Sequence, residues 1–199
     1  MHICVYGAAS ETIDRRYIEA AEELGAAIAK RGHTLVFGGG AWGLMGGAAR
    51  GAHRENGAIV GIAPRFFDTN DILYQDCTEM VFTHTMRERK QLMEDRSQAF
   101  VMMPGGIGTY EEFFEILTLK QLGRHNKPIV ILNTLGYYDR ILDLLKATAD
   151  TGFMKPDCLQ LYAACDTPDA VLSAIEQYDP EALDVRHLKN LYRKSASPL

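Results

Sequence analysis

The sequence predicts a single α/β domain built on a doubly wound, mostly parallel sheet. Short apolar or β-branched runs alternate along the chain with longer segments whose apolar residues recur at helical spacing. Such alternation is typical of right-handed βαβ crossovers, which place helices on both faces of one parallel sheet. At 199 residues and 47% hydrophobic composition, the chain has the size and apolar content of one domain. Together with the glycine-rich turns that follow several runs, these observations predict a Rossmann-like architecture.

The expected strands and helices alternate in the order that a parallel sheet requires. The strands are short and rich in apolar residues, and they span residues 3–6, 34–37, 58–62, 79–83, 99–103, 129–132 and 159–163. The helices lie between most of them and span residues 13–31, 44–55, 86–96, 110–122, 137–151 and 168–178. A long irregular connection, residues 64–78, has the length of a lid or pocket wall. We assign residues 1–179 to the Rossmann-like domain and residues 180–199 to a C-terminal helix or tail.

Charge and composition restrict the kind of partner. The net charge of −5 provides no basic field for a nucleic acid or an anionic membrane, so a small polar metabolite is the expected partner. No apolar run approaches the roughly 20 residues that cross a bilayer, and the N-terminus lacks a secretory signal pattern. The six histidines and four cysteines form no metal-ligand cluster and no CxxC motif. We therefore expect a cytoplasmic protein with reduced cysteines and no metal ion.

Glycine-rich turns follow three of the expected strands, at residues 7–10, 38–40 and 104–109. In a parallel sheet these turns emerge at the same edge, where open α/β folds bind ligands. Glycine lets backbone N–H groups approach an anion closely, and the N-terminus of the following helix adds its dipole and its unpaired donors. One such turn is equally well explained as an ordinary strand-to-helix connection, whereas three together indicate a phosphate site.

The second glycine turn raises a different possibility. The segment GGGAWG, residues 38–43, matches the G-x-G-x-x-G pattern of dinucleotide-binding proteins. It follows the second expected strand rather than the first, and the next strand ends without the acidic residue that binds a ribose 2′-hydroxyl. No G-x-x-x-x-G-K-[ST] motif occurs either. The sequence therefore disfavours both an NAD(P)-dependent oxidoreductase and a nucleoside triphosphatase.

The stretch FVMMPGGIGTYEEFFEILT, residues 100–118, places two carboxylates directly after the third glycine turn. Thr109 and Glu112 have the spacing of a capping box, with Thr109 as the N-cap residue of the following helix. A cap does not require the three glycines of PGGIG, whereas an anion site explains them. Shortly before, MRERKQLM carries Arg87, Arg89 and Lys90 on an expected short helix. These basic residues form either a solvated helix face or, in an otherwise acidic chain, part of the same site.

The two segments together resemble one family. MRERK at residues 86–90, followed by PGGIGTYEE at residues 104–112, is similar to the paired M-x-x-R-K and P-G-G-x-G-T-x-x-E motifs of the Lonely guy (LOG) family, the cytokinin riboside 5′-monophosphate phosphoribohydrolases. GGGAWGLMG at residues 38–46 resembles the other glycine motif of that family, and the likeness extends over residues 3–178. Such sequences often carry a lysine decarboxylase label, but no pattern here marks a Schiff-base lysine with pyridoxal phosphate partners.

The resemblance implies hydrolysis of the N-glycosidic bond of an adenosine 5′-monophosphate, often N6-prenylated, by a cofactor-free homodimer or larger homo-oligomer. By motif match, Glu112 is the catalytic carboxylate, which stabilises positive charge on the sugar and orients or deprotonates water. Arg89 is the matching arginine, and because it keeps its proton we expect it to bind and orient. The residues expected to bind substrate are Gly39, Gly40, Asp71, Lys90, Gly106, Ile107, Gly108, Thr109, Tyr110, Glu111 and Thr118.

Some positions depart from the family pattern. The first turn reads Gly-Ala-Ala-Ser where relatives commonly show Cys-Gly-Ser-Ser, Arg87 replaces a frequent histidine, and Trp42 is bulky at a usually small position. These departures concern substrate preference more than reaction type, and they leave both prenylated and unmodified AMP open. A nucleotide- or cofactor-binding carrier that uses the same glycine turns without hydrolysis is the alternative function.

Overall fold

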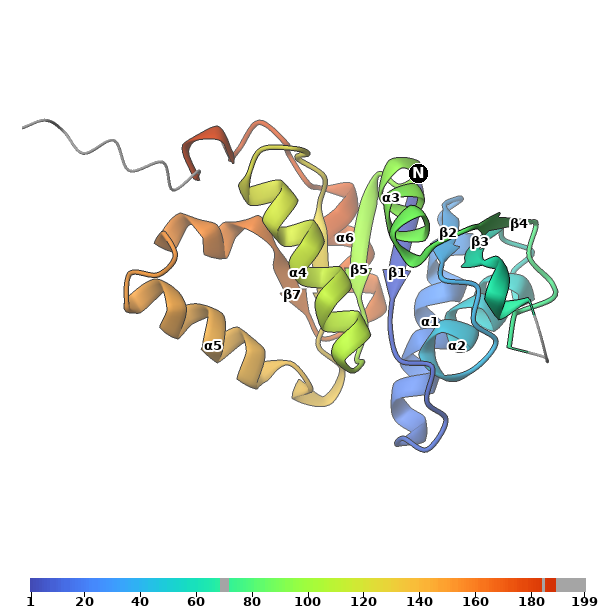
Figure 1. Cartoon of the computed structure of the whole chain (residues 1–199). Helices are drawn as coiled ribbons and strands as arrows, with labels where there is room; N and C mark the ends of the chain where they lie inside the picture. Colours follow the sequence, from blue (N-terminus) through green and yellow to red (C-terminus); the bar gives the residue numbers. More distant parts are fainter. Residues whose placement is uncertain (69–71, 184, 189–199) are drawn as a thin grey trace, which may run out of the picture.

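A computed structural model describes residues 1–68, 72–183 and 185–188 of the chain (Figure 1). Its centre is a seven-stranded sheet with the order β4-β3-β2-β1-β5-β6-β7, in which every neighbouring pair is parallel. The order reverses between β1 and β5, so the sheet is doubly wound, as the sequence predicts. The strands span His2–Tyr6 (β1), Thr34–Phe37 (β2), Ile59–Pro64 (β3), Glu79–Thr83 (β4), Ala99–Met102 (β5), Ile129–Leu132 (β6) and Ala163–Cys165 (β7).

Helices cover both faces of the sheet (Figure 1). The cluster that contains Ile3 and Val5 of β1 joins the face covered by α1, α2 and α6, and the cluster with Cys4 and Tyr6 joins the face covered by α3, α4 and α5. None of the helices in the described ranges is long and apolar enough to span a membrane. The α-helices span Arg15–Lys30 (α1), Gly43–Arg54 (α2), Met86–Arg96 (α3), Ile107–Gln121 (α4), Asp139–Asp150 (α5) and Pro168–Glu176 (α6). The 3₁₀ helices span Arg65–Phe67 (η1), Thr134–Gly136 (η2), Pro156–Leu161 (η3) and Val185–Leu188 (η4).

One expected strand is wrong. The strand expected at residues 159–163 is absent there, because Pro156–Leu161 forms the 3₁₀ helix η3. The strand β7 follows it at Ala163–Cys165. Pro156 occupies the first helical position, where its fixed φ favours a helical turn. The residues that η3 buries, Cys158 and Leu161, are three positions apart, which is the period of a 3₁₀ helix. The helix expected from residue 110 begins three residues earlier, and the other boundaries agree to within two residues.

The long connection and the C-terminal tail are described in part. In the connection, η1 is followed by an isolated antiparallel bridge between Leu73 and Gly40. In the tail, Val185 and Leu188 of η4 are buried in the cluster on the α4 side of the sheet. Residues 180–183 form turns and bends rather than the start of the expected C-terminal helix, and residues 184 and 189–199 lie outside the described residues. The division of the chain at residue 179 stays a prediction.

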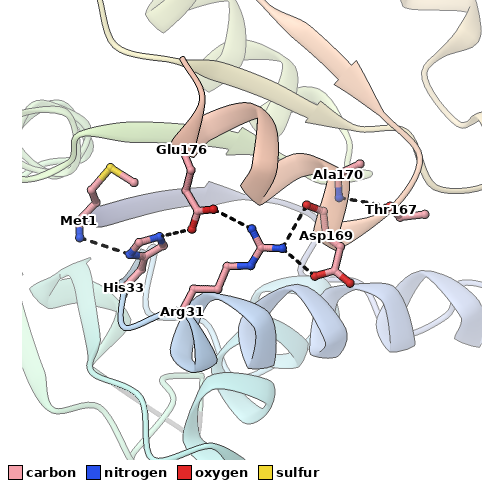
Figure 2. A network of polar contacts seen from close by, with 7 residues as sticks. All are labelled: Met1, Arg31, His33, Thr167, Asp169, Ala170 and Glu176. Carbon is pink, nitrogen blue, oxygen red and sulfur yellow. Dashed lines mark hydrogen bonds and ion pairs between the residues drawn. The ribbon is translucent and has the colours of Figure 1, made fainter. Parts of the chain in front are cut away.

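Polar contacts tie the end of α1 to α6 (Figure 2). Arg31 donates from Nη1 to Oε2 of Glu176 (2.9 Å) and from Nη2 to Oδ1 of Asp169 (3.0 Å). Nε2 of His33 lies 3.0 Å from Oε1 of Glu176, and this hydrogen bond is the main reason that the pKa of Glu176 is lowered. The network joins residues far apart in sequence and fixes α6 onto α1.

Lys120 of α4 is fully buried, and among the described residues its Nζ has no hydrogen-bond partner. The ammonium lies 4.5 Å from the centroid of the Tyr178 ring, a cation–π contact that only partly replaces water. Burial lowers the pKa of Lys120 to about 8. The side chain is outside the candidate active site, and its charge is a cost to folding at neutral pH.

Lys120→Met is therefore expected to raise the free energy of unfolding at pH 7, by up to about 3 kcal/mol for a pKa lowered from 10.5 to about 8. Below pH 8 the lysine is charged in both states, and between pH 8 and 10.5 the folded state loses the proton first, so the wild type gains stability there. Urea unfolding at pH 7 and pH 10 measures the difference in the free energy of unfolding between Lys120→Met and the wild type. We expect this difference to be smaller at pH 10. The exposed Lys146→Met is the control, and an advantage of Lys120→Met that does not change with pH would contradict the prediction.

Candidate active site

The carboxyl ends of β1 and β5 meet where the strand order reverses, which is the position at which open α/β folds bind ligands. The turn after β1 contacts the glycine turn after β5, since the N–H of Ala8 donates to the carbonyl oxygen of Pro104 (3.1 Å). The turn after β2 lies at the same edge because β2 pairs with β1 in parallel. The three glycine turns therefore share one edge of the sheet, as the sequence predicts.

The turn after β5 leaves the start of α4 open. Gly106 is the N-cap residue, and Ile107 is 86% exposed. A Cβ built on Gly106 or on Gly108 meets no atom within 4 Å. The first N–H groups of a helix have no partner inside it and lie at the positive end of its dipole. The loop therefore has the geometry of an anion site.

The capping box expected between Thr109 and Glu112 is wrong. The N-cap is Gly106, so Thr109 lies within the first turn of α4, buried against Gly105. Glycine serves as an N-cap without a side chain, and no side chain caps this helix. The carboxylate of Glu112 bonds Arg89 instead of a backbone N–H. The absence of a side-chain cap leaves the first-turn donors available to a ligand.

Arg89 and Glu112 form a buried ion pair between α3 and α4. Nη1 of Arg89 donates to Oε1 of Glu112 (2.8 Å), and Nε donates to the carbonyl oxygen of Ile62 in β3 (3.2 Å). Arg89 is 6% exposed, and the side chain of Glu112 is 13% exposed. Because one planar guanidinium makes both bonds, the position of Glu112 is coupled to the end of β3. The structure thus brings together the two residues predicted to be catalytic.

The other oxygen of Glu112 is free within the described part of the chain, where no side chain or backbone group donates to Oε2. Burial raises the pKa of the Glu112 carboxyl, and the nearby Arg89 partly offsets that effect. A carboxylate with one oxygen fixed and the other free can orient a water molecule and accept its proton. It can also stabilise positive charge that develops on a ligand.

A second ion pair lies on the outer side of the first. Nζ of Lys90 bonds the carboxylate of Glu111 and lies 2.8 Å from Oε2 of Glu115. Burial alone acts to lower the pKa of Lys90, but these hydrogen bonds raise it, so the side chain stays an ammonium. Both Lys90 and Glu111, predicted as substrate-binding residues, therefore lie next to the Arg89–Glu112 pair and are bonded to each other.

The glycine turn after β2 makes room for the arginine. A Cβ on Gly38 would overlap Nη2 of Arg89. Gly39 has a φ of +78° and accepts a hydrogen bond from the N–H of Tyr74 (2.8 Å), and Gly40 forms the bridge with Leu73. The described contacts of Gly39 and Gly40 are thus with the chain itself, and their contact with substrate stays a prediction.

Gly38→Ala is expected to reduce kcat/KM of the reaction that the family resemblance implies by roughly ten- to hundredfold, because the methyl group displaces the guanidinium that holds Glu112. The φ of Gly38 lies outside the left-handed region, so alanine itself strains no backbone. The control is Gly32→Ala, where φ is +71° and the new methyl meets nothing within 4 Å. That control loses about 1 kcal/mol of stability and keeps full turnover. Unchanged turnover in Gly38→Ala would contradict the role of Arg89.

The remaining predicted substrate residues are distributed more widely. Tyr110 is half-buried, and its Oη lies 3.4 Å from Oη of Tyr137. Thr118 is exposed. It lies six residues after Glu112, roughly 9 Å further along α4, and outside the Arg89–Glu112 pair. Asp71 lies outside the described residues.

Two tyrosines that the sequence motifs do not indicate contact the glycine loop. Oη of Tyr137 donates to the carbonyl oxygen of Gly105 (2.8 Å), and Oη of Tyr138 donates to that of Met103 (2.7 Å). Both follow β6, whose carboxyl end lies beside that of β5. The signal that the sequence offers is an aromatic pair five residues after the end of a correctly predicted strand.

Fold and site define a Rossmann-like α/β protein with an open helix N-terminus beside a carboxylate–guanidinium pair. Within the described ranges, no group of three or more His, Cys, Asp or Glu side chains is arranged to hold a metal ion. The family model described as "Possible lysine decarboxylase" matches residues 45–175.

Two relatives show the family. The cytokinin riboside 5′-monophosphate phosphoribohydrolase of Mycobacterium tuberculosis is 41% identical over 172 residues, which cover 86% of this chain and 91% of the relative. The Arabidopsis thaliana protein of the same name, LOG5, is 34% identical over 178 residues, which cover 89% of this chain and 78% of the relative. The chain belongs to the LOG family of cytokinin riboside 5′-monophosphate phosphoribohydrolases.

Solved structures share the fold at lower identity. The molybdenum cofactor carrier protein of Chlamydomonas reinhardtii has a TM-score of 0.66 and 23% identity, covering 88% of this chain and 96% of that chain. The molybdenum cofactor binding protein of Rippkaea orientalis has a TM-score of 0.65 and 19% identity, covering 88% of this chain and 93% of that chain. At these identities the likeness concerns the fold alone.

Proposed function

We propose that the chain hydrolyses the N-glycosidic bond of adenosine 5′-monophosphates, with or without an N6 substituent, to the free base and ribose 5-phosphate. The observation that carries the proposal is the position of Glu112. This partly buried carboxylate has one oxygen fixed by Arg89 and one free, and it stands about one and a half helical turns beyond the open N-terminus of α4. Family membership supports the same reaction, since relatives at 34–41% identity are named phosphoribohydrolases.

The reaction requires a carboxylate close to a phosphate site. As the bond between C1′ and the purine nitrogen breaks, its electron pair leaves with the base and positive charge develops on the ribose ring. The phosphate binds at the N-terminal turn formed by Gly106, Ile107 and Gly108, which places the ribose along the first turns of α4. Glu112 then faces the anomeric carbon, stabilises its positive charge and takes the proton of the attacking water.

Arg89 and Lys90 support this geometry in different ways. Arg89 fixes Oε1 of Glu112 and, as a permanent cation, acts to lower the pKa of this carboxyl against the effect of burial. Lys90 holds Glu111 and Glu115 on α4 and adds positive charge at the side of the phosphate site. No cofactor is needed for these steps, because water, a carboxylate and fixed cations supply the chemistry.

The direct test is chromatographic. The purified protein is incubated with AMP and, separately, with N6-isopentenyl-AMP, and free base is quantified. We expect base from both, and the ratio of the two kcat/KM values assigns the preferred substrate. Nucleotide that binds but is recovered intact in both reactions would contradict the proposal and favour a nucleotide- or cofactor-binding carrier. That alternative has less support, because phosphate binding alone does not require a buried Glu112 with a free oxygen.

We further propose a homodimer or larger homo-oligomer in the cytoplasm. Exposed apolar side chains at the carboxyl edge of the sheet, among them Trp42, Phe66 and Met86, support an association surface near the site. Light scattering at micromolar concentration measures the mass, and a monomer of 22.2 kDa would contradict the assembly.

A further inference from the structure

Three consecutive carbonyl groups of the glycine loop accept hydrogen bonds from two separate segments, the turn after β1 and the segment after β6. Oη of Tyr138 donates to Met103 (2.7 Å), the N–H of Ala8 donates to Pro104 (3.1 Å), and Oη of Tyr137 donates to Gly105 (2.8 Å). Two of the three donors are adjacent tyrosine side chains from the segment after β6. The loop therefore has its carbonyl side fixed before any ligand arrives.

Fixing a carbonyl also fixes an N–H. In a trans peptide the C=O of one residue and the N–H of the next lie in one plane and point in opposite directions. The bond from Tyr137 to the carbonyl of Gly105 therefore sets the direction of the N–H of Gly106, the N-cap residue of α4. Glycine flanks this peptide on both sides, so the backbone itself offers little resistance to rotation of the peptide plane. The tyrosine hydroxyl supplies that resistance.

The hydroxyl of Tyr137 is a committed donor. It carries one proton, which the carbonyl of Gly105 accepts, so Tyr110 is the donor in the 3.4 Å contact between the two phenols. A chain of hydrogen bonds thus runs from Tyr110 through Tyr137 to the loop.

The tyrosine pair is itself held in place. Oδ1 of Asn133 accepts the N–H of Tyr138 (2.7 Å), and Nδ2 of Asn133 donates to Oδ1 of Asp139 (2.8 Å). The ring of Tyr137 packs edge-on against Tyr17 of α1, with 5.7 Å between centroids, and against Tyr138 at 4.9 Å. Tyr138 is fully buried and Tyr137 is 39% exposed, so the second can be altered without opening the core.

We propose that Tyr137, with Tyr138 behind it, is a positioning residue that holds the Gly105–Gly106 peptide in the orientation in which the N–H of Gly106 faces the phosphate of the substrate. The inference rests on the proposed function, since it assumes that a phosphate binds at the N-terminus of α4. It assigns to the segment after β6 a role in phosphate affinity and none in the chemistry of the glycosidic bond.

The test separates phosphate binding from the rest of the nucleotide. Dissociation constants of AMP and of adenosine are measured by calorimetry in a Glu112→Gln background, with and without Tyr137→Phe. Loss of the hydroxyl is expected to raise the dissociation constant of AMP by about tenfold and that of adenosine by less than about twofold. In the otherwise wild-type chain, Tyr137→Phe raises KM for AMP by a similar factor and changes kcat by less than about threefold.

Tyr178→Phe is the matched control, because its hydroxyl also donates one hydrogen bond, to Oδ1 of Asn126 (2.6 Å), remote from the loop. It is expected to leave both dissociation constants unchanged. If Tyr137→Phe raises the dissociation constants of AMP and adenosine equally, or leaves that of AMP unchanged, the inference is overturned and the proposed function stands. If the parent protein already binds AMP no more tightly than adenosine, the phosphate-loop assignment fails together with the inference, and base release decides the function separately.

Discussion

Glu112→Gln is expected to reduce base release from AMP by about a thousandfold or more, while the dissociation constant of AMP changes by less than about threefold. The amide keeps the size of the side chain and the hydrogen bond with Nη1 of Arg89, but it neither accepts a proton from water nor balances positive charge on the ribose. Rapid-quench measurement of free base gives the rate, and calorimetry gives the affinity.

The control for this variant is Glu115→Gln, one turn further along α4. Glu115 is partly exposed and also forms an ion pair with Lys90, at 2.8 Å, so the control removes one carboxylate charge from the same helix. We expect less than about threefold loss of turnover there. A Glu112→Gln protein that retains a tenth of wild-type turnover would contradict the catalytic assignment.

Arg89→Met is expected to reduce kcat by roughly a hundred- to a thousandfold and to shift the acidic limb of the pH–rate profile to higher pH. Burial raises the pKa of Glu112, and Arg89 is the main group that lowers it. Removing the guanidinium raises this pKa further, so a smaller fraction of the protein carries the active carboxylate at a given acidic pH. Stopped assays between pH 5 and 9 measure the limb directly.

Arg87→Met, an exposed arginine of the same helix, is the control and is expected to leave the limb in place. Arg89→Met also leaves Glu112 buried without its cation, which destabilises the fold. The double variant Arg89→Met/Glu112→Gln removes the unpaired charge and is expected to recover thermal stability but no activity. If the acidic limb of the pH–rate profile moves to lower pH in Arg89→Met, a group other than Glu112 determines that limb and the prediction is contradicted.

The fold is largely predictable from this sequence because its signals are local. The helix at Met86 starts where expected, since Thr85 caps it through its side chain and Glu88 supplies the reciprocal bond to the N–H of His84. The helix of the glycine loop starts earlier than expected, because the T-x-x-E pattern at Thr109 resembles a cap while Gly106 takes that place. The strand expected at residues 159–163 is misplaced because Leu159 and Leu161 have the period-two spacing of a strand, although both belong to the 3₁₀ helix η3.

The site is predictable as a set of motifs but not as a geometry. The motif match identifies Arg89 and Glu112, and the structure joins them at 2.8 Å. The need for Gly38 beside the guanidinium and the donation from Tyr137 to the loop depend on contacts between distant segments, which no local pattern contains. Gly39 carries the positive φ that glycine tolerates, and its carbonyl oxygen accepts the N–H of Tyr74 in the connection after β3.

The most direct measurement is a single-turnover reaction with AMP in excess protein, in which adenine and ribose 5-phosphate are both quantified for the wild type and for Glu112→Gln. The account predicts equal amounts of the two products from the wild type, and intact AMP bound to the variant. Base release at the wild-type rate by Glu112→Gln, or AMP recovered intact from the wild type, would contradict it.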